Sequence, residues 1–135
     1  MFKSIISNCF NTIYTPEKKL DKQKLKLLLN KLGFNPISNG TLYIIEVLEF
    51  FYNNNILEIK SLNEAYIISA KIHKLNIKKI RWNVESALLV MNKYADTELL
   101  QEIFYWYDNY KNITPKYFFS TMLDFLNENF EEYQK

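Results

Sequence analysis

Apolar side chains recur at helical spacing through most of the chain, and this pattern predicts an all-α fold. A helix is expected over residues 21–32, ending at Gly33, because glycine readily adopts the left-handed conformation that follows a helix. The helix expected over residues 41–52 is apolar on most sides, which places it at the centre of the domain. Two later helices are expected over about residues 97–110 and 115–126.

Residues 2–13 place six apolar side chains on one stripe of a short amphipathic helix: Phe2, Ile5, Ile6, Cys9, Phe10 and Ile13. This helix belongs to an N-terminal extension over residues 1–20, and we expect it to dock on the core. A helix that binds a partner or a membrane surface is the alternative. Lys3 is the only basic residue of this helix, which disfavours a membrane surface.

Residues 62–94 have the pattern of two helices joined by a tight turn. Two apolar-periodic runs meet at Leu75 and Asn76, with no proline between them. Ser61 or Asn63 is expected to cap the first helix and Asn76 the second, since these side chains accept the free amides that open a helix. Two such helices form a helix-turn-helix candidate. The inward positions are Ala65, Ile68, Ile72 and Leu75 in the first helix, and Ile77, Ile80, Val84, Ala87, Leu88 and Met91 in the second.

Charge is segregated along the chain. Residues 1–95 carry 14 Lys or Arg against 7 Asp or Glu, a net +7, while residues 96–135 carry 3 against 8, a net −5. No acidic residue lies between Glu64 and Glu85. Such a basic stretch points to a polyanionic partner, although a solvated face of a lysine-rich helix gives the same pattern.

Composition limits the remaining possibilities. A chain of 135 residues is expected to form a single helical domain over 1–135 with a substantial core. Its 2 glycines and 3 prolines leave few of the turns that β-hairpins need. Cys9 is the single cysteine, which excludes an internal disulfide and fits a reducing cytoplasm. No apolar run reaches membrane-spanning length.

The residues that would support catalysis or metal binding are scarce. His73 is the only histidine, and it is far from Cys9 in the sequence, so a metal site or a Cys-His nucleophile is not expected. His73 is expected to contact phosphate or a helix end. Glu46 and Glu49 lie three positions apart on one helix and are expected to be solvated. We therefore expect no enzyme, no cofactor and no small-molecule substrate.

Several short motifs occur in order along roughly residues 20–130. They are Leu32-Gly33-Phe34, Gly40-Thr41-Leu42-Tyr43-Ile44, Glu46-Val47, Ala70-Lys71, Ile80, Ala87-Leu88 and Thr114-Pro115-Lys116-Tyr117-Phe118. In order and spacing, these motifs resemble the C-terminal DNA-binding effector domain of the stage-zero sporulation master response regulator of spore-forming Firmicutes. The resemblance implies a compact bundle of about six helices that contains a helix-turn-helix and often binds in tandem along promoter boxes.

Two features depart from that family. The regulator carries an N-terminal receiver domain, for which this chain leaves no room, so we expect a stand-alone effector domain. The family's second helix has Arg-Val-Glu-Arg-Ala-Ile-Arg-His where this chain has residues 79–86. Only Lys79 keeps a positive charge at an arginine position. An arginine fork grips guanine at two atoms, whereas lysine is a mobile point charge, so base reading is altered or weakened.

These features together predict a sequence-specific DNA-binding protein, a transcription regulator whose second paired helix enters the major groove. Its partner is double-stranded DNA, bound by one copy, a homodimer or copies in tandem, with no membrane involved. The alternative is a protein-interaction module that kept the fold and lost specific DNA reading, using the surface around Trp82 and the Trp106-Tyr107 region. The residues expected at the DNA are Lys71, Lys74, Asn76, Lys78, Lys79, Arg81, Trp82 and Ser86.

Overall fold

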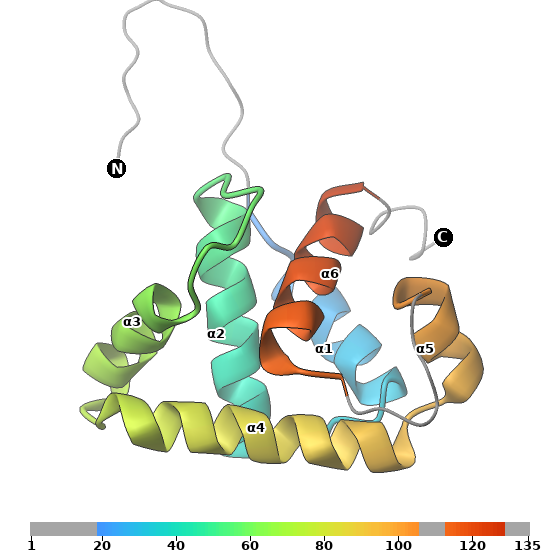
Figure 1. Cartoon of the computed structure of the whole chain (residues 1–135), viewed down its shortest axis with the longest axis horizontal. Coiled ribbons are helices and arrows are strands. Elements are labelled where there is room, and N and C mark those ends of the chain that lie inside the picture. Colours follow the sequence, from blue (N-terminus) through green and yellow to red (C-terminus); the bar gives the residue numbers. More distant parts are fainter. Residues whose placement is uncertain (1–18, 106–112, 129–135) are drawn as a thin grey trace, which may run out of the picture.

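The computed structural model describes residues 19–105 and 113–128, and within these ranges it is all-helical (Figure 1). The expected helix over residues 2–13 therefore lies outside the described residues. The prediction of an all-α bundle is confirmed. The helices are α1 (Lys22–Lys31), α2 (Asn39–Asn53), α3 (Asn63–His73), α4 (Ile77–Tyr94), α5 (Thr97–Ile103) and α6 (Pro115–Glu128).

The first helix begins and ends as the sequence predicts. The Asp21 carboxylate accepts hydrogen bonds from the amides of Gln23 and Lys24, at 3.1 and 3.2 Å, and so caps α1. Gly33 follows the helix with a φ of +101°, a value that glycine adopts at little cost. The amide of Phe34 then donates to the carbonyl of Leu29 at 3.0 Å, which closes the helix end.

Helix α2 forms the centre of the bundle, as predicted, and packs against α1, α3, α4 and α6 (Figure 1). Its start differs from the prediction, which placed residues 34–40 in a loop and Thr41 at the helix start. The cap is Ser38, whose hydroxyl oxygen accepts from the Thr41 amide at 3.2 Å. Thr41 is inside the helix, where its hydroxyl donates to the Asn35 carbonyl at 2.7 Å.

Helix α4 crosses the N-terminal end of α2 (Figure 1). Gly40 of α2 lies against Asn83 and Ala87 of α4 at this crossing. A β-carbon at position 40 would collide with the backbone carbonyl oxygen of Asn83 and would lie 2.8 Å from the Ala87 β-carbon. The absence of a side chain therefore allows the two helices to cross at this distance.

Aromatic side chains join the C-terminal part to the core. Phe104 is fully buried and stacks on Phe118, with ring centroids 5.6 Å apart. The helix expected over residues 97–110 ends at Ile103 instead, because the backbone leaves the helix at Phe104 as this ring enters the core. Residues 106–112, including Trp106 and Tyr107, lie outside the described residues.

Candidate nucleic-acid interface

Helices α3 and α4 are joined by a turn of three residues, as the sequence predicts. Lys74 adopts a left-handed conformation with a φ of +55°, and the next amide, of Leu75, donates to the Ala70 carbonyl at 3.0 Å. Asn76 then caps α4, accepting the Lys79 amide at 2.9 Å. The predicted cap at Asn76 is confirmed, and its side-chain oxygen is engaged in holding the turn.

The buried face of α3 differs from the prediction. Ile72 and Leu75 were expected to point inward, but their side chains are 60% and 37% exposed. The helix buries Ala65, as predicted, together with Tyr66, Ser69 and Ala70. Periodicity of apolar residues missed this face because two of its members carry hydroxyl groups, which a pattern of apolar positions assigns to solvent.

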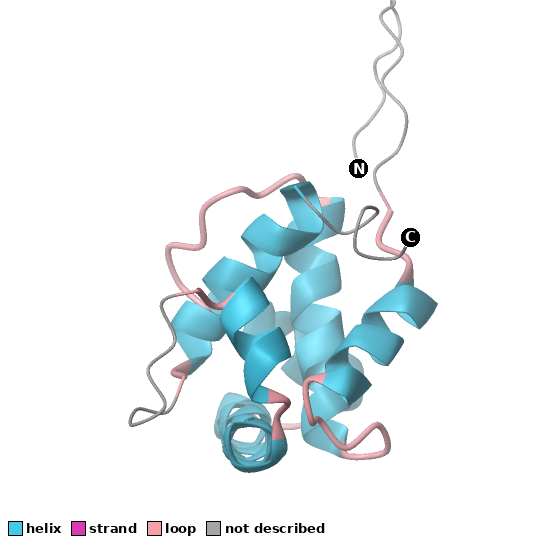
Figure 2. Ribbon diagram, turned by 90° about the vertical axis from the view of Figure 1, so that its right-hand side faces the viewer, coloured by secondary structure: helices cyan, strands magenta, loops and turns pink. Residues whose placement is uncertain are grey.

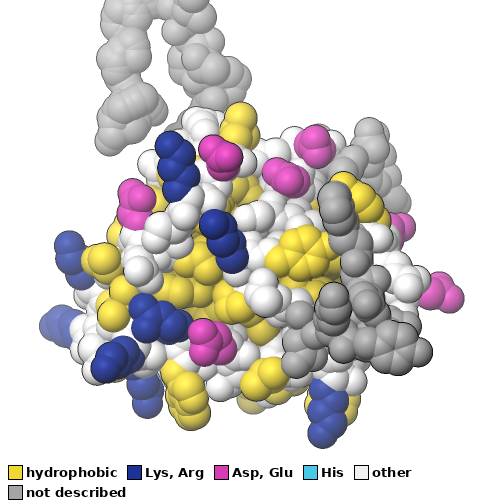
Figure 3. Space-filling model, viewed as in Figure 1, with side chains coloured by type: hydrophobic (Ala, Val, Ile, Leu, Met, Phe, Trp, Pro, Cys, Tyr) yellow, Lys and Arg dark blue, Asp and Glu magenta, His cyan; other side chains and the backbone are white. Residues whose placement is uncertain are grey.

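Four lysines are exposed around the connection between α3 and α4. Lys71 lies on α3, Lys74 lies between the two helices, and Lys78 and Lys79 lie in the first turn of α4. Figure 3 shows the basic side chains gathered over α3 and the beginning of α4, at the left-hand end of the molecule. We call these four residues the lysine cluster. Since each ammonium group is in solvent, the cluster can meet phosphate oxygens without rearrangement of the helices.

The outer face of α4 is free of other described elements. Figure 2 looks along α4 and shows the remaining described helices on one side of it. The predicted inward residues Ile80, Val84 and Met91 are buried, so the helix phase is confirmed. Trp82 points outward with 63% of its surface exposed, as predicted, and Leu89 lies on the same face at 58%.

Arg81 and Ser86 occupy different surroundings from the lysine cluster. Arg81 is half-buried, and its guanidinium group donates to the Asn63 side-chain oxygen at 3.2 Å. It therefore ties the flank of α4 to the first residue of α3. Ser86 is half-buried.

Tyr66 lies beneath this flank of α4, with 2% of its surface exposed. Its ring meets that of Phe119 edge to face at 6.4 Å. Among the described residues, its phenol oxygen has no hydrogen-bond partner. Burial raises the pKa of the Tyr66 phenol well above its usual value, Glu85 raises it further, and Arg81 acts in the opposite direction. The phenol is therefore neutral in the folded protein.

Replacement of Tyr66 by phenylalanine is expected to raise the free energy of unfolding by about 1 kcal/mol at pH 7. The substitution keeps the edge-to-face contact with Phe119 and removes a buried hydroxyl without a partner, a group that costs about 1–3 kcal/mol. Chemical denaturation measures the change. Tyr94→Phe is the matched control, because Tyr94 is 66% exposed and should give no change.

The same variant has a predicted dependence on pH. A phenol whose pKa is higher in the folded than in the unfolded state stabilises the fold below the unfolded pKa of about 10, and this contribution is lost as the pH rises above it. Wild type should therefore lose up to about 1.4 kcal/mol per pH unit more than Tyr66→Phe above pH 10. Parallel curves for the two proteins would contradict the burial of this phenol.

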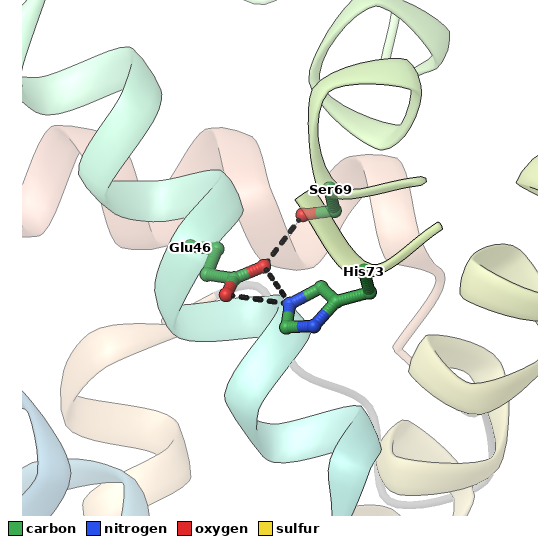
Figure 4. A network of polar contacts seen from close by, with 3 residues as sticks. All are labelled: Glu46, Ser69 and His73. Carbon is green, nitrogen blue, oxygen red and sulfur yellow. Dashed lines mark hydrogen bonds and ion pairs between the residues drawn. The ribbon is translucent and has the colours of Figure 1, made fainter. Parts of the chain in front are cut away.

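A polar network couples α2 to α3 (Figure 4). The Glu46 carboxylate accepts the Ser69 hydroxyl at 2.9 Å and lies 2.8 Å from Nε2 of His73. The expectations for these residues were wrong: His73 contacts a carboxylate, and Glu46 is not simply solvated. Glu49 also has a partner, with the Lys22 ammonium 3.6 Å away. This network has no signature in the sequence, because Glu46 is separated from Ser69 and His73 by 23 and 27 positions.

Acidic residues collect away from the lysine cluster. α5 lies at the opposite end of α4 from α3 (Figure 1). The described exposed acids of this region are Asp96, Glu98, Glu102, Asp124 and Glu128. The lysine cluster therefore lies at the α3–α4 turn, while these five acids lie on or directly before α5 and on α6.

Comparison with known proteins found no matching family model, curated protein or solved structure. None of the helices within residues 19–105 and 113–128 combines the length and apolar character needed to cross a membrane. The same residues contain no group of three or more His, Cys, Asp or Glu side chains that could hold a metal ion.

Proposed function

We propose that this protein binds double-stranded DNA and regulates transcription, with α3 and α4 acting as a helix-turn-helix and α4 lying in the major groove. The observation that carries the proposal is the lysine cluster, four exposed cations around one tight turn, in a stretch without an acidic residue between Glu64 and Glu85. Lysines placed in this way neutralise phosphates and release their counterions, which supplies most of the affinity for DNA.

The shape of α4 suits this role. An α-helix with its side chains is about 10–12 Å across, and the major groove of B-DNA is about 12 Å wide. Trp82 lies at the middle of the exposed face, beyond Lys78 and Lys79 in the first turn. Its indole ring could pack on a thymine methyl group or a sugar edge while the lysines hold the flanking phosphates.

The resemblance to the effector domain of the sporulation regulator supports the same assignment. That domain binds DNA through a helix-turn-helix placed at the corresponding point of the chain. Lysine in place of arginine favours phosphate contact over bidentate reading of guanine. Arg81 is held by Asn63, so we assign it to fixing the angle between α3 and α4 rather than to base contact.

Selection of bound duplexes from a random pool tests the proposal. We expect an enriched motif that is rich in A·T pairs, since the exposed face of α4 offers an indole and lysines but no free arginine fork. Enrichment of no motif, together with no binding of any duplex at low salt, would refute the proposal. Binding without enrichment of a motif would mean that the protein binds DNA independently of sequence. That result would contradict sequence-specific reading but not DNA binding.

A second candidate function is a protein-interaction module that kept the fold. The observation in its favour is the apolar character of the same face, where Trp82 and Leu89 are 63% and 58% exposed. Exposed aromatic side chains of this kind often anchor protein interfaces. The Trp106-Tyr107 region, which was expected to contribute, lies outside the described residues.

Trp82→Ala distinguishes the two functions. Because Trp82 is exposed, we expect the free energy of unfolding to change by no more than about 0.5 kcal/mol. The motif selected from random duplexes should change, while affinity for nonspecific DNA at low salt should remain. Leu57→Ala, at a 69% exposed position before α3, is the control and should leave the motif unchanged. An identical motif for Trp82→Ala and wild type would remove Trp82 from the DNA-reading surface, and selection of no motif by either protein would favour the second function.

A further inference from the structure

A groove of about 300 Å³ runs between α1, α2 and α3, on a different surface from the outer face of α4. Its central wall is one side of α2, from Leu42 near the beginning to Asn54 after the end. Two of its apolar residues, Leu42 and Ile72, are 41% and 60% exposed. The apolar lining residues are Leu42, Ile45, Phe50, Ala65, Ile68 and Ile72.

The described chain begins at one end of this groove. Leu20 is buried, at 7% exposure, and its amide donates to the Asn53 side-chain oxygen at 2.9 Å. Asn53 also lines the groove. The residues that precede Lys19 are therefore attached to the domain at the C-terminal end of α2 (Figure 1), next to an apolar surface that no described residue covers.

The preceding segment fits this surface in length and character. Residues 2–13, which carry the apolar stripe, would span about 18 Å as a helix. The stretch of α2 from Leu42 to Asn54 is also about 18 Å long. The connection over residues 14–18 can reach about 17 Å, enough to turn the chain back. Lys3 is the only charged side chain in residues 2–13, so the segment itself brings little charge to be buried. The groove also has the charged lining residues Lys22, Lys26, Glu46 and Glu49, of which Lys22 is paired with Glu49 and Glu46 with His73.

We propose that residues 2–13 of the same chain bind in the groove between α1, α2 and α3, with the apolar stripe facing Leu42, Ile68 and Ile72. The bound segment covers the exposed apolar side chains of both partners, which is favourable because exposed apolar surface of this kind is otherwise left in water. It also explains why Ile72 and Ile68 are apolar although α3 does not bury them in the core. The segment would support α3 from the side opposite to α4.

Disulfide trapping in the full chain tests this proposal, because Cys9 lies on the apolar stripe and is the only cysteine. The test variant is Ile72→Cys, which places a second thiol in the groove. The matched control is Leu89→Cys, at a similarly exposed position on α4. Under mild oxidation we expect the intramolecular disulfide to form at least about tenfold faster with the groove cysteine. A docked segment has a higher effective concentration than a freely tethered one.

Non-reducing electrophoresis and peptide mapping separate the outcomes. A disulfide within one chain between positions 9 and 72 supports the proposal. The proposal would be overturned by equal rates for the groove variant and Leu89→Cys, or by no oxidation of the groove variant. Disulfides only between chains would also overturn it, because the groove would then bind the segment of a second copy. Leu42→Cys repeats the test from α2 if Ile72→Cys loses helical circular dichroism. None of these measurements involves DNA, so the result is independent of the proposed function.

Discussion

Gly40→Ala is expected to lower the free energy of unfolding by about 2 kcal/mol. The added methyl group would meet the Asn83 carbonyl oxygen and the Ala87 β-carbon, at the crossing of α2 and α4. Overpacking a core contact costs about 1–3 kcal/mol, and here one obstacle is backbone, which moves only if α4 moves. The better helix propensity of alanine returns about 1 kcal/mol, which reduces the loss without cancelling it.

Thermal unfolding followed by circular dichroism measures this effect, and we expect a decrease of about 10 °C in the transition temperature. Asn39→Ala is the matched control, since it introduces alanine at the neighbouring position of the same helix, where the side chain is exposed. It should change the free energy of unfolding by no more than about 0.5 kcal/mol. A Gly40→Ala protein as stable as Asn39→Ala would mean that α2 and α4 cross at a greater distance.

Replacing all four residues of the lysine cluster by glutamine is expected to weaken DNA binding on the order of a thousandfold at about 0.1 M salt. Each phosphate contact contributes a slope of about −0.9 to the plot of log affinity against log salt concentration. Losing four contacts should therefore make the slope less steep by about 3.6. Fluorescence anisotropy of a labelled duplex at several salt concentrations gives both quantities.

The control for this experiment must remove the same charge from another surface. Glutamine at Lys19, Lys24, Lys26 and Lys60 also removes four positive charges, and these residues precede α3. If placement of charge determines binding, the control should keep a salt slope close to that of wild type. Equal losses in the two variants would show that net charge alone attracts DNA, and that α3 and α4 hold no special position.

Features set by neighbours along the chain could be predicted from the sequence. The end of the first helix at Gly33 and the Asn76 cap follow from local backbone chemistry. The outward direction of Trp82 follows from the phase of Ile80 and Val84, because a helix that buries these residues places position 82 on its other side.

Features set by distant neighbours could not be predicted. Ser69 is buried because Glu46, on another helix, accepts its hydroxyl proton, and apolar periodicity contains no information about such a partner. Arg81 turns toward Asn63 for the same kind of reason. Gly40 lay just before the helix expected over residues 41–52, whereas the structure places it inside α2, where the backbone of α4 passes.

Both glycines of the chain lie against α4. Gly40 faces Asn83 and Ala87, and a β-carbon at Gly33 would lie 3.1 Å from the backbone of Ala95, just past the end of the helix. Evolution of this protein is therefore constrained unevenly. Outer positions of α4 such as Trp82 can change partner or specificity without disturbing the fold, while positions 33 and 40 must remain glycine. We expect divergent descendants to share these two glycines, seven residues apart, even where their outer faces have nothing in common.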